Sequence, residues 1–230
     1  MATTRTSQIL SEVARGDVED AVLPARLVSL CARALPITGV GLVLMTDAGP
    51  AGTVAASDGT ASTLEELQFT LGEGPCVDCS GAGRPVLVPS LAVGGAQWPV
   101  FTDGALRAGV AAVFAFPLRV GAIRLGVLAL YRDATGPLGG PGLAEALAFA
   151  DAATTVLLHL QVHAPQGGPI SVLEDRTEVH QATGMVSVQA GVDLASALLL
   201  LRARAYATER PVLELSREVL SRLVRFDAAA

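Results

Sequence analysis

The sequence predicts an α+β fold, in which an antiparallel sheet flanked by helices is followed by a C-terminal bundle of three short helices. Apolar runs of strand length recur between residues 37 and 132, and glycine, proline and aspartate separate them. Five or six strands with helices only at the ends and in one excursion are typical of an α+β sandwich. Residues 171–226 differ, because their apolar residues recur at helical spacing in three short stretches.

The first elements are a helix and a hairpin. Residues 1–16 are polar, and no element is assigned to them. Apolar residues at helical spacing predict a helix over 18–35, and Pro36 ends it because proline lacks the N–H that a helix needs. Two strands follow at 37–46 and 52–57, joined by a tight turn at 47–50.

The excursion begins with a short helix over 64–68, for which Thr63 is placed as the N-cap and Glu66 as its capping-box partner. Residues 72–76, Gly-Glu-Gly-Pro-Cys, are expected to form a loop, and a helical turn is expected around 98–106.

Three more strands and a long helix complete this region. The strands are predicted at 85–88, 110–119 and 122–132, the last two joined by a turn at Val120-Gly121. The helix over 142–163 has one apolar seam, formed by Leu143, Leu147, Ala150, Thr154, Leu157 and Gln161.

The C-terminal helices have clear start and stop signals. After the proline- and glycine-rich linker 164–170, Ser171 is placed to cap a helix from Val172 that Gly191 stops. Asp193 is placed to cap the second helix, and Pro211 suits the first turn of the third. Their apolar stripes are Val172, Val179, Ala182, Val186 and Gln189 in the first helix; Leu194, Ala197, Leu198, Leu201 and Ala205 in the second; and Leu215, Val219 and Leu223 in the third.

Composition excludes several classes of protein. Of the 230 residues 51% are hydrophobic, which is ample core material for a globular chain. The sequence contains no lysine and no asparagine, so P-loop, Schiff-base and kinase lysines are absent, and no nucleophile elbow or zinc-protease motif occurs. We therefore expect no enzymatic activity, no catalytic residue and no metal site. The few cysteines and the absence of a signal peptide or membrane span predict a cytoplasmic protein.

Residues 171–226 carry a family signature. The run Gln181-Ala182-Thr183-Gly184-Met185, then Ala197, Leu201-Arg202 and Ala205, then Glu209-Arg210-Pro211 resemble the ANTAR domain of bacterial transcription antiterminators. That resemblance implies binding of leader RNA hairpins. The candidate RNA-binding residues are the arginines Arg202, Arg204, Arg210, Arg217 and Arg222. The segment is nevertheless near-neutral, with seven arginines against eight acids over 170–230 within a chain of net charge −6.

The earlier region resembles a GAF domain. Residues 67–76, Leu-Gln-Phe-Thr-Leu-Gly-Glu-Gly-Pro-Cys, and 114–118, Phe-Ala-Phe-Pro-Leu, are similar to actinobacterial GAF-ANTAR proteins. The resemblance implies a small-molecule sensor at 17–163, a linker at 164–170 and an RNA-binding domain at 171–226. Its ligand pocket is expected between the sheet and the excursion at 62–109, with Cys76 and Trp98 as lining residues. Neither a cyclic-nucleotide motif nor a haem histidine is found, so the ligand and any cofactor are unknown.

Two other functions remain open. Cys76 and Cys79 have the spacing of a redox pair or half a metal site, as in a GAF-type free methionine sulfoxide reductase, although ordinary packing is the interpretation we favour. A dimerisation module that acts through another protein is the second alternative. The seams of the helices 142–163 and from Val172 predict a parallel homodimer. The function that best fits is a signal-responsive transcription antitermination regulator.

Overall fold

The computed structural model describes residues 2–16, 19–46, 49–163, 174–208 and 210–226 of the chain. Some predicted features fall on the remaining positions and so lie outside the described residues. They are the start of the GAF region at 17, part of the turn 47–50, the linker 164–170, the Ser171 cap and the helix start at Val172, and Glu209.

A five-stranded antiparallel sheet is the centre of the larger domain, with the strand order β2-β1-β5-β4-β3. The predicted hairpin of residues 37–57 is confirmed as β1 paired with β2, and Gly121, at φ +59°, makes the turn between β4 and β5. The strands are β1 (Gly39–Thr46), β2 (Gly49–Ala56), β3 (Val86–Val88), β4 (Ala112–Val120) and β5 (Ile123–Arg132).

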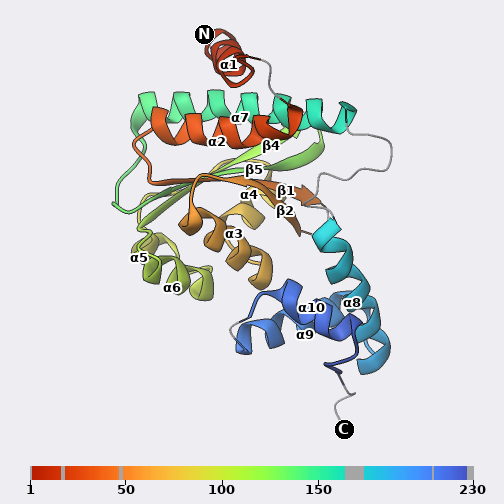
Figure 1. The fold of residues 1–230 in the computed structure, drawn as a ribbon. Coiled ribbons are helices and arrows are strands. Elements are labelled where there is room, and N and C mark those ends of the chain that lie inside the picture. The colour runs from red at the N-terminus through yellow and green to blue at the C-terminus, as the bar shows by residue number, and fades with distance from the viewer. Residues whose placement is uncertain (1, 17–18, 47–48, 164–173, 209, 227–230) are drawn as a thin grey trace.

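Helices cover both faces of this sheet (Figure 1). One face carries the 3-10 turn η1 (Asp20–Val22), α2 (Leu23–Ala34) and α7 (Gly139–His163), and α1 (Ala2–Val13) packs on the outer side of α7 and α2. The other face carries the excursion, made of α3 (Gly59–Leu71), α4 (Pro75–Ala82), α5 (Leu91–Gly94) and α6 (Pro99–Arg107).

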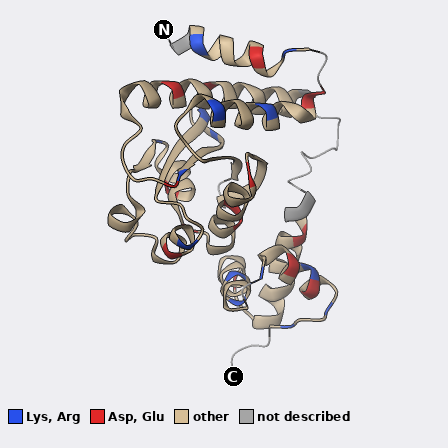
Figure 2. Cartoon of the chain, turned by 60° about the vertical axis from the view of Figure 1, so that its left-hand side comes forward, with Lys and Arg blue, Asp and Glu red and all other residues tan. Residues whose placement is uncertain are grey.

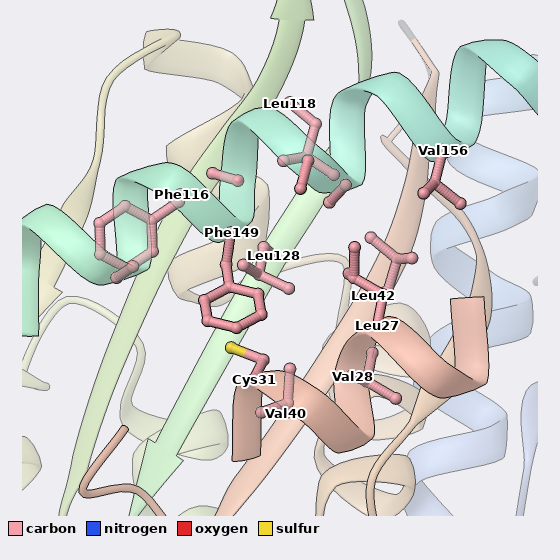
Figure 3. Packing of buried hydrophobic residues seen from close by; sticks show 14 of the residues in the cluster. Leu27, Val28, Cys31, Val40, Leu42, Phe116, Leu118, Leu128, Phe149 and Val156 are labelled. Atoms are coloured by element: carbon pink, nitrogen blue, oxygen red, sulfur yellow. The ribbon is translucent and has the colours of Figure 1, made fainter. Parts of the chain in front are cut away.

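Strand alternation divides the apolar residues between two cores. On β4, Phe114 and Phe116 face α2 and α7, while Val113 and Ala115 face the excursion, because successive side chains of a strand point to opposite faces. Figure 3 shows the first core, where residues of α2 and α7 meet the strands and the sulfur of Cys31 points toward the ring of Phe149.

Helix α7 is by length and composition apolar enough to cross a membrane. Its apolar side is buried against β4, β5, α1 and α2, with Phe149 and Leu157 fully covered. It is thus the core helix of a globular domain. Ala150 and Leu157 of the predicted seam are buried within the same chain, whereas Leu147 and Gln161 of that seam are exposed. Only part of the seam is therefore accessible to a second copy of the chain.

A three-helix bundle ends the chain below α3 (Figure 1). It consists of α8 (Glu174–Ala190), α9 (Leu194–Ala207) and α10 (Val212–Leu220). The predicted cap is confirmed, since the Asp193 carboxylate accepts from the N–H of Ser196 at 2.9 Å, and Gly191 lies at φ +65° after α8.

The bundle uses its apolar stripes internally. Val179, Ala182 and Val186, predicted as a weak pairing seam, are buried by 97% or more against α9 and α10. The sequence predicts Leu223 on the stripe of the third helix, but α10 ends at Leu220, and Leu223 is 78% exposed.

Three further local features differ from the sequence analysis. Within residues 1–16, to which no element is assigned there, the structure has α1 (Ala2–Val13), which buries Ile9 and Val13 and pairs Arg5 with Glu145 of α7 at 2.5 Å. The first excursion helix begins at Gly59, where Asp58 rather than Thr63 caps it by accepting from the N–H of Ala61. The expected loop 72–76 ends in a helix, because Pro75 starts α4.

Candidate functional site

Four polar side chains meet away from solvent between the sheet and the excursion. Glu65 and Gln68 come from α3, Cys76 from the first turn of α4, and Tyr131 from the end of β5. Their exposed fractions are 3%, 1%, 1% and 0%. Burial of this many polar groups in an apolar core is costly unless they satisfy one another. We name this group the Glu65 cluster.

Hydrogen bonds connect all four members. The Tyr131 hydroxyl donates to Glu65 Oε1 at 2.8 Å and accepts from Gln68 Nε2 at 3.1 Å. Gln68 Nε2 also lies 3.3 Å from Glu65 Oε2 and 3.1 Å from Cys76 Sγ, so its two hydrogens are shared among three acceptors. Its Oε1 accepts from the N–H of Cys76 at 2.8 Å, which fixes the start of α4. Gln68 is therefore the hub of the network.

Two glycines make room for the cluster. Gly41 of β1 lies under the Glu65 carboxyl, and a Cβ built at Gly41 would collide with Glu65 Oε1. Gly74, at φ +135°, lies under Gln68, where a Cβ would be 2.6 Å from Gln68 Oε1. Close approach of backbone to a buried side chain is one of the few roles that only glycine fills.

Burial makes the Glu65 carboxyl easy to protonate. It raises the pKa of Glu65 from 4.5 to about 7, against the opposing effect of the hydrogen bonds from Tyr131 and Cys76. Burial and the nearby carboxylate also raise the pKa values of Cys76 and Tyr131 well above their ordinary values. The cluster can therefore bind or release one proton near neutral pH, with Glu65 as the titrating group.

The thiols are poorly prepared for nucleophilic chemistry in this conformation. The reactive form is the thiolate, and burial disfavours it. Besides Cys76, burial raises the pKa of Cys79 to about 12, and Cys31 lies across the sheet with a pKa that burial also raises. All three are free and buried. This argues against a reductase in which Cys76 and Cys79 act as nucleophiles.

Side chains fill the place where the ligand pocket was expected. Trp98 is 3% exposed and packs in one cluster with Leu64, Leu91, Phe101 and Tyr131. Its Nε1 donates to Asp78 Oδ2 at 3.1 Å. Cys76 and Trp98 are thus buried core residues, because α4 packs directly on β4 and β5 and α6 packs against α3. An open groove of about 700 Å³ lies outside them, lined by residues of α4, β3 and the following segment, among them Asp78, Arg84, Val86 and Gln97.

The structure does not bring the five predicted RNA-binding arginines to one face of the bundle. Arg202 is half-buried, with its guanidinium carbon 5.8 Å from the centre of the Phe69 ring of α3, and burial lowers its pKa. Arg217 is paired with Glu178 of α8 at 2.7 Å. Arg222 is exposed in the left-handed conformation, at φ +62°. Figure 2 shows acidic residues interspersed with the arginines of this bundle.

Arg204 and Arg210 do lie together. Both approach Glu218 of α10, with which Arg210 forms two hydrogen bonds at 2.8 and 2.9 Å. Arg210, and to a smaller extent the charge of Arg204, lower the pKa of Glu218. Arg204 also donates to the carbonyl of Arg225 at 2.9 Å and lies over the Phe226 ring. At this end of the bundle two arginines therefore lie around one carboxylate.

Sequence reasoning missed Glu65, Gln68, Tyr131 and Phe69. A signal for the first two was present, since Ala61, Leu64, Glu65 and Gln68 share one helical face that also carries apolar residues. The predicted helix began too late for that face to be recognised. Nothing in the sequence indicates that Tyr131 contacts Glu65, or that Phe69 contacts Arg202, because each pair is far apart along the chain.

Solved structures show the fold of the larger domain. No family model and no curated protein matches the sequence. The GAF domain of an Acinetobacter phosphoenolpyruvate-protein phosphotransferase matches with a TM-score of 0.53 at 10% identity, covering 71% of this chain and 96% of that one. The GAF domain of a Coxiella burnetii phosphoenolpyruvate-protein phosphotransferase gives 0.54 at 16% identity, covering 70% and 95%. The reduced form of fRMsr from Staphylococcus aureus gives 0.51 at 15% identity, covering 68% and 94%.

At such identities the likeness is one of fold alone. The five-stranded antiparallel sheet with its helices is a GAF fold, as the sequence predicted. The predicted resemblance of residues 171–226 to the ANTAR domain stays a prediction.

We predict that Gly41→Ala displaces the Glu65 carboxyl and lowers the free energy of unfolding by about 2 kcal/mol, because neither the strand backbone nor the buried carboxyl has room to move. Gly59→Ala is the matched control, since Gly59 has open space around its Cα at the start of α3. Urea unfolding of both variants checks this, and equal stabilities would contradict it.

We predict that Glu65 makes stability depend on pH. The folded protein holds the Glu65 proton more tightly than the unfolded chain, so unfolding releases a proton between pH 4.5 and about 7. The contribution of Glu65 to the free energy of unfolding is greatest below pH 4.5 and falls as the pH rises through this window. Above about pH 7 it is lower by about 3 kcal/mol. Glu65→Gln stays neutral at both pH values. The free energy of unfolding of this variant minus that of wild type should therefore be more positive at pH 8 than at pH 5.

Urea unfolding at the two pH values measures this difference. Glu19→Gln removes one exposed carboxylate and serves as the charge control. A Glu65→Gln effect of equal size at pH 5 and pH 8 would show that Glu65 does not titrate in this range.

Proposed function

We propose that the chain is a signal-responsive transcription antitermination regulator, in which a GAF sensor controls an RNA-binding C-terminal bundle. The observation that carries the proposal is the direct contact between the two parts. Phe69 of α3, which also holds the Glu65 cluster, is 6% exposed and belongs to the apolar core of the bundle. A sensor helix that completes the core of a second domain is a physical route from signal to output.

The signal is an unidentified small molecule that acts on the excursion side of the sheet. Because side chains fill that region, its binding requires α3, α4 or α6 to shift. A shift of α3 changes both the hydrogen bonds of the Glu65 cluster and the packing of Phe69 in the core of the bundle. The cytoplasm suits this regulator, since all three cysteines are free thiols.

The output is the binding of leader RNA hairpins. The bundle resembles an ANTAR domain in its spaced small residues, of which Ala182, Ala197 and Ala205 are fully buried between its helices. Arg204 and Arg210 are the phosphate contacts that the geometry favours, because both lie at one end of α9 and α10. Arg217 and Arg222 remain secondary candidates.

The protein acts as a parallel homodimer, through a face of α7 that includes Leu147 of the predicted seam together with Leu158 and Val162. Leu147, Leu158 and Val162 are 43%, 37% and 76% exposed on the described surface of this helix. Their spacing of eleven and four residues places them along one side of a helix. Thr155 and Asp151, both exposed, lie on the same stripe.

We predict that Arg204→Ala and Arg210→Ala each weaken binding of a paired-hairpin RNA and lower the slope of log affinity against log salt by about one. The contacts that they lose, the Arg210–Glu218 ion pair and the Arg204 hydrogen bond to the carbonyl of Arg225, are at the surface, so the fold should persist. Arg107→Ala, which removes an exposed arginine of α6, is the control. If the folded protein binds paired hairpins no better than scrambled RNA of equal length, the antitermination proposal fails and a protein partner replaces RNA.

We predict a dimer by light scattering at micromolar concentration, and a monomer for the double variant Leu158→Asp, Val162→Asp, because two buried carboxylates oppose an apolar interface. Val93→Asp changes an 83% exposed valine of α5 and should leave the dimer intact. A monomeric wild type would remove the homodimer from the proposal.

A further inference from the structure

The contact between α3 and α9 has the form of a clasp made of few parts. The Phe69 ring enters the core of the bundle, and Arg202 of α9 lies over that ring. The same guanidinium rests on Gly72, which ends α3 at φ +69°, and a Cβ at Gly72 would collide with Arg202 Nη1. Thus one aromatic ring, one arginine and one glycine hold the two parts together at this point. We name these three residues the α3–α9 clasp.

In the α3–α9 clasp the Arg202 guanidinium lacks part of its hydrogen bonds, which favours release of the contact. Arg202 Nε is buried and has no hydrogen-bond partner among the described residues, and burial lowers the pKa of the guanidinium. A buried cation without its full set of hydrogen bonds costs free energy. The cation–π contact with Phe69 offsets part of that cost. The docked state therefore retains Arg202 at a cost that solvent or an external anion would remove.

The loop behind the clasp connects it with the Glu65 cluster. Gly72 touches Arg202 at one end of the segment 72–76, and at the other end the N–H of Cys76 donates to Gln68. Gly74 lies in between, against the Gln68 side chain. A shift of α3 relative to α4 thus changes the hydrogen bonds of the Glu65 cluster and, at the same time, the contact of Arg202 with Gly72.

We propose that the α3–α9 clasp is an autoinhibitory contact, in which Arg202 is held against Phe69 and Gly72 and becomes available to a polyanion only when the bundle leaves α3. Arg202 cannot occupy both places, so a polyanion and α3 compete for it. By linkage, anything that loosens α3 strengthens polyanion binding, and a bound polyanion promotes undocking. The inference rests on the proposed function in one respect, that the natural polyanion is RNA.

Docking is measured on the full chain by energy transfer from Trp98, the only tryptophan, to a dansyl dye on the bundle. Val188→Cys provides the attachment point, since Val188 of α8 is 84% exposed and the native cysteines are buried. Phe69→Ala in this background should lower the transfer. Leu67→Ala is the matched control, because Leu67 lies on the same helix but packs toward Gly104 of α6.

Affinity is measured with two probes, the paired-hairpin RNA and long-chain inorganic polyphosphate. Phe69→Ala should bind polyphosphate about tenfold more tightly than wild type, as expected if about nine tenths of the wild-type bundles are docked. Adding Arg202→Met should abolish that gain, while Arg202→Met alone should keep the bundle docked because it removes the unsatisfied cation. Thermal unfolding by circular dichroism shows that each variant is folded.

The outcomes separate the two proposals. Loss of energy transfer with a tenfold gain for polyphosphate supports the clasp, even if paired-hairpin RNA does not bind and the antitermination function fails. Unchanged energy transfer, or unchanged polyphosphate affinity, in folded Phe69→Ala overturns the clasp even if RNA binds. A gain that survives Arg202→Met overturns the role of Arg202.

Discussion

Helix α3 has to satisfy two partners at once, and much of the structure follows from that constraint. Its inner side places Glu65 and Gln68 against the sheet, and the next side places Phe69 in the bundle. Its ends are fixed by local chemistry: the Asp58 carboxylate caps the first turn, and Gly72 in the left-handed region ends the last. A helix held at both ends and packed on two sides moves as a unit, so disturbance on one side reaches the other.

The Glu65 cluster departs from the apolar packing around it. A carboxyl, a phenol and a thiol in an otherwise apolar core cost free energy unless they satisfy one another. Here the hydrogen bonds to Glu65 favour its charged form, while burial favours its neutral form and has the larger effect. The same burial that makes Glu65 titrate near neutrality keeps the thiol of Cys76 protonated. The same buried environment therefore favours proton binding by Glu65 and opposes formation of the reactive Cys76 thiolate.

The bundle is small, and a residue from the other domain completes its core. Its charges are largely balanced within it, since Arg210 and Arg217 pair with Glu218 and Glu178. A polyanion that binds at Arg210 or Arg217 has to displace these acids. Arg202 is held against α3 in the docked state, so the proposed autoinhibitory contact would give a near-neutral domain a means of control without a large basic surface.

Local signals determined the elements that depend on neighbouring residues. Turn glycines fixed the hairpins, Asp193 fixed the start of α9, and the length of the apolar pattern fixed α7, because caps, turns and periodicity act within a few residues. The α+β fold class followed from these, whereas the GAF fold was expected from a family resemblance of the element order and of residues 67–76 and 114–118. Only the tertiary structure decided which face of each helix is covered. It turned Val179, Ala182 and Val186 inward, buried Trp98, and placed Arg202 on Phe69, because such contacts join residues up to 133 positions apart in the sequence. The Glu65 cluster belongs to this second group, since a carboxyl on an exposed helix and one sealed against Tyr131 have the same sequence pattern until the sheet covers it.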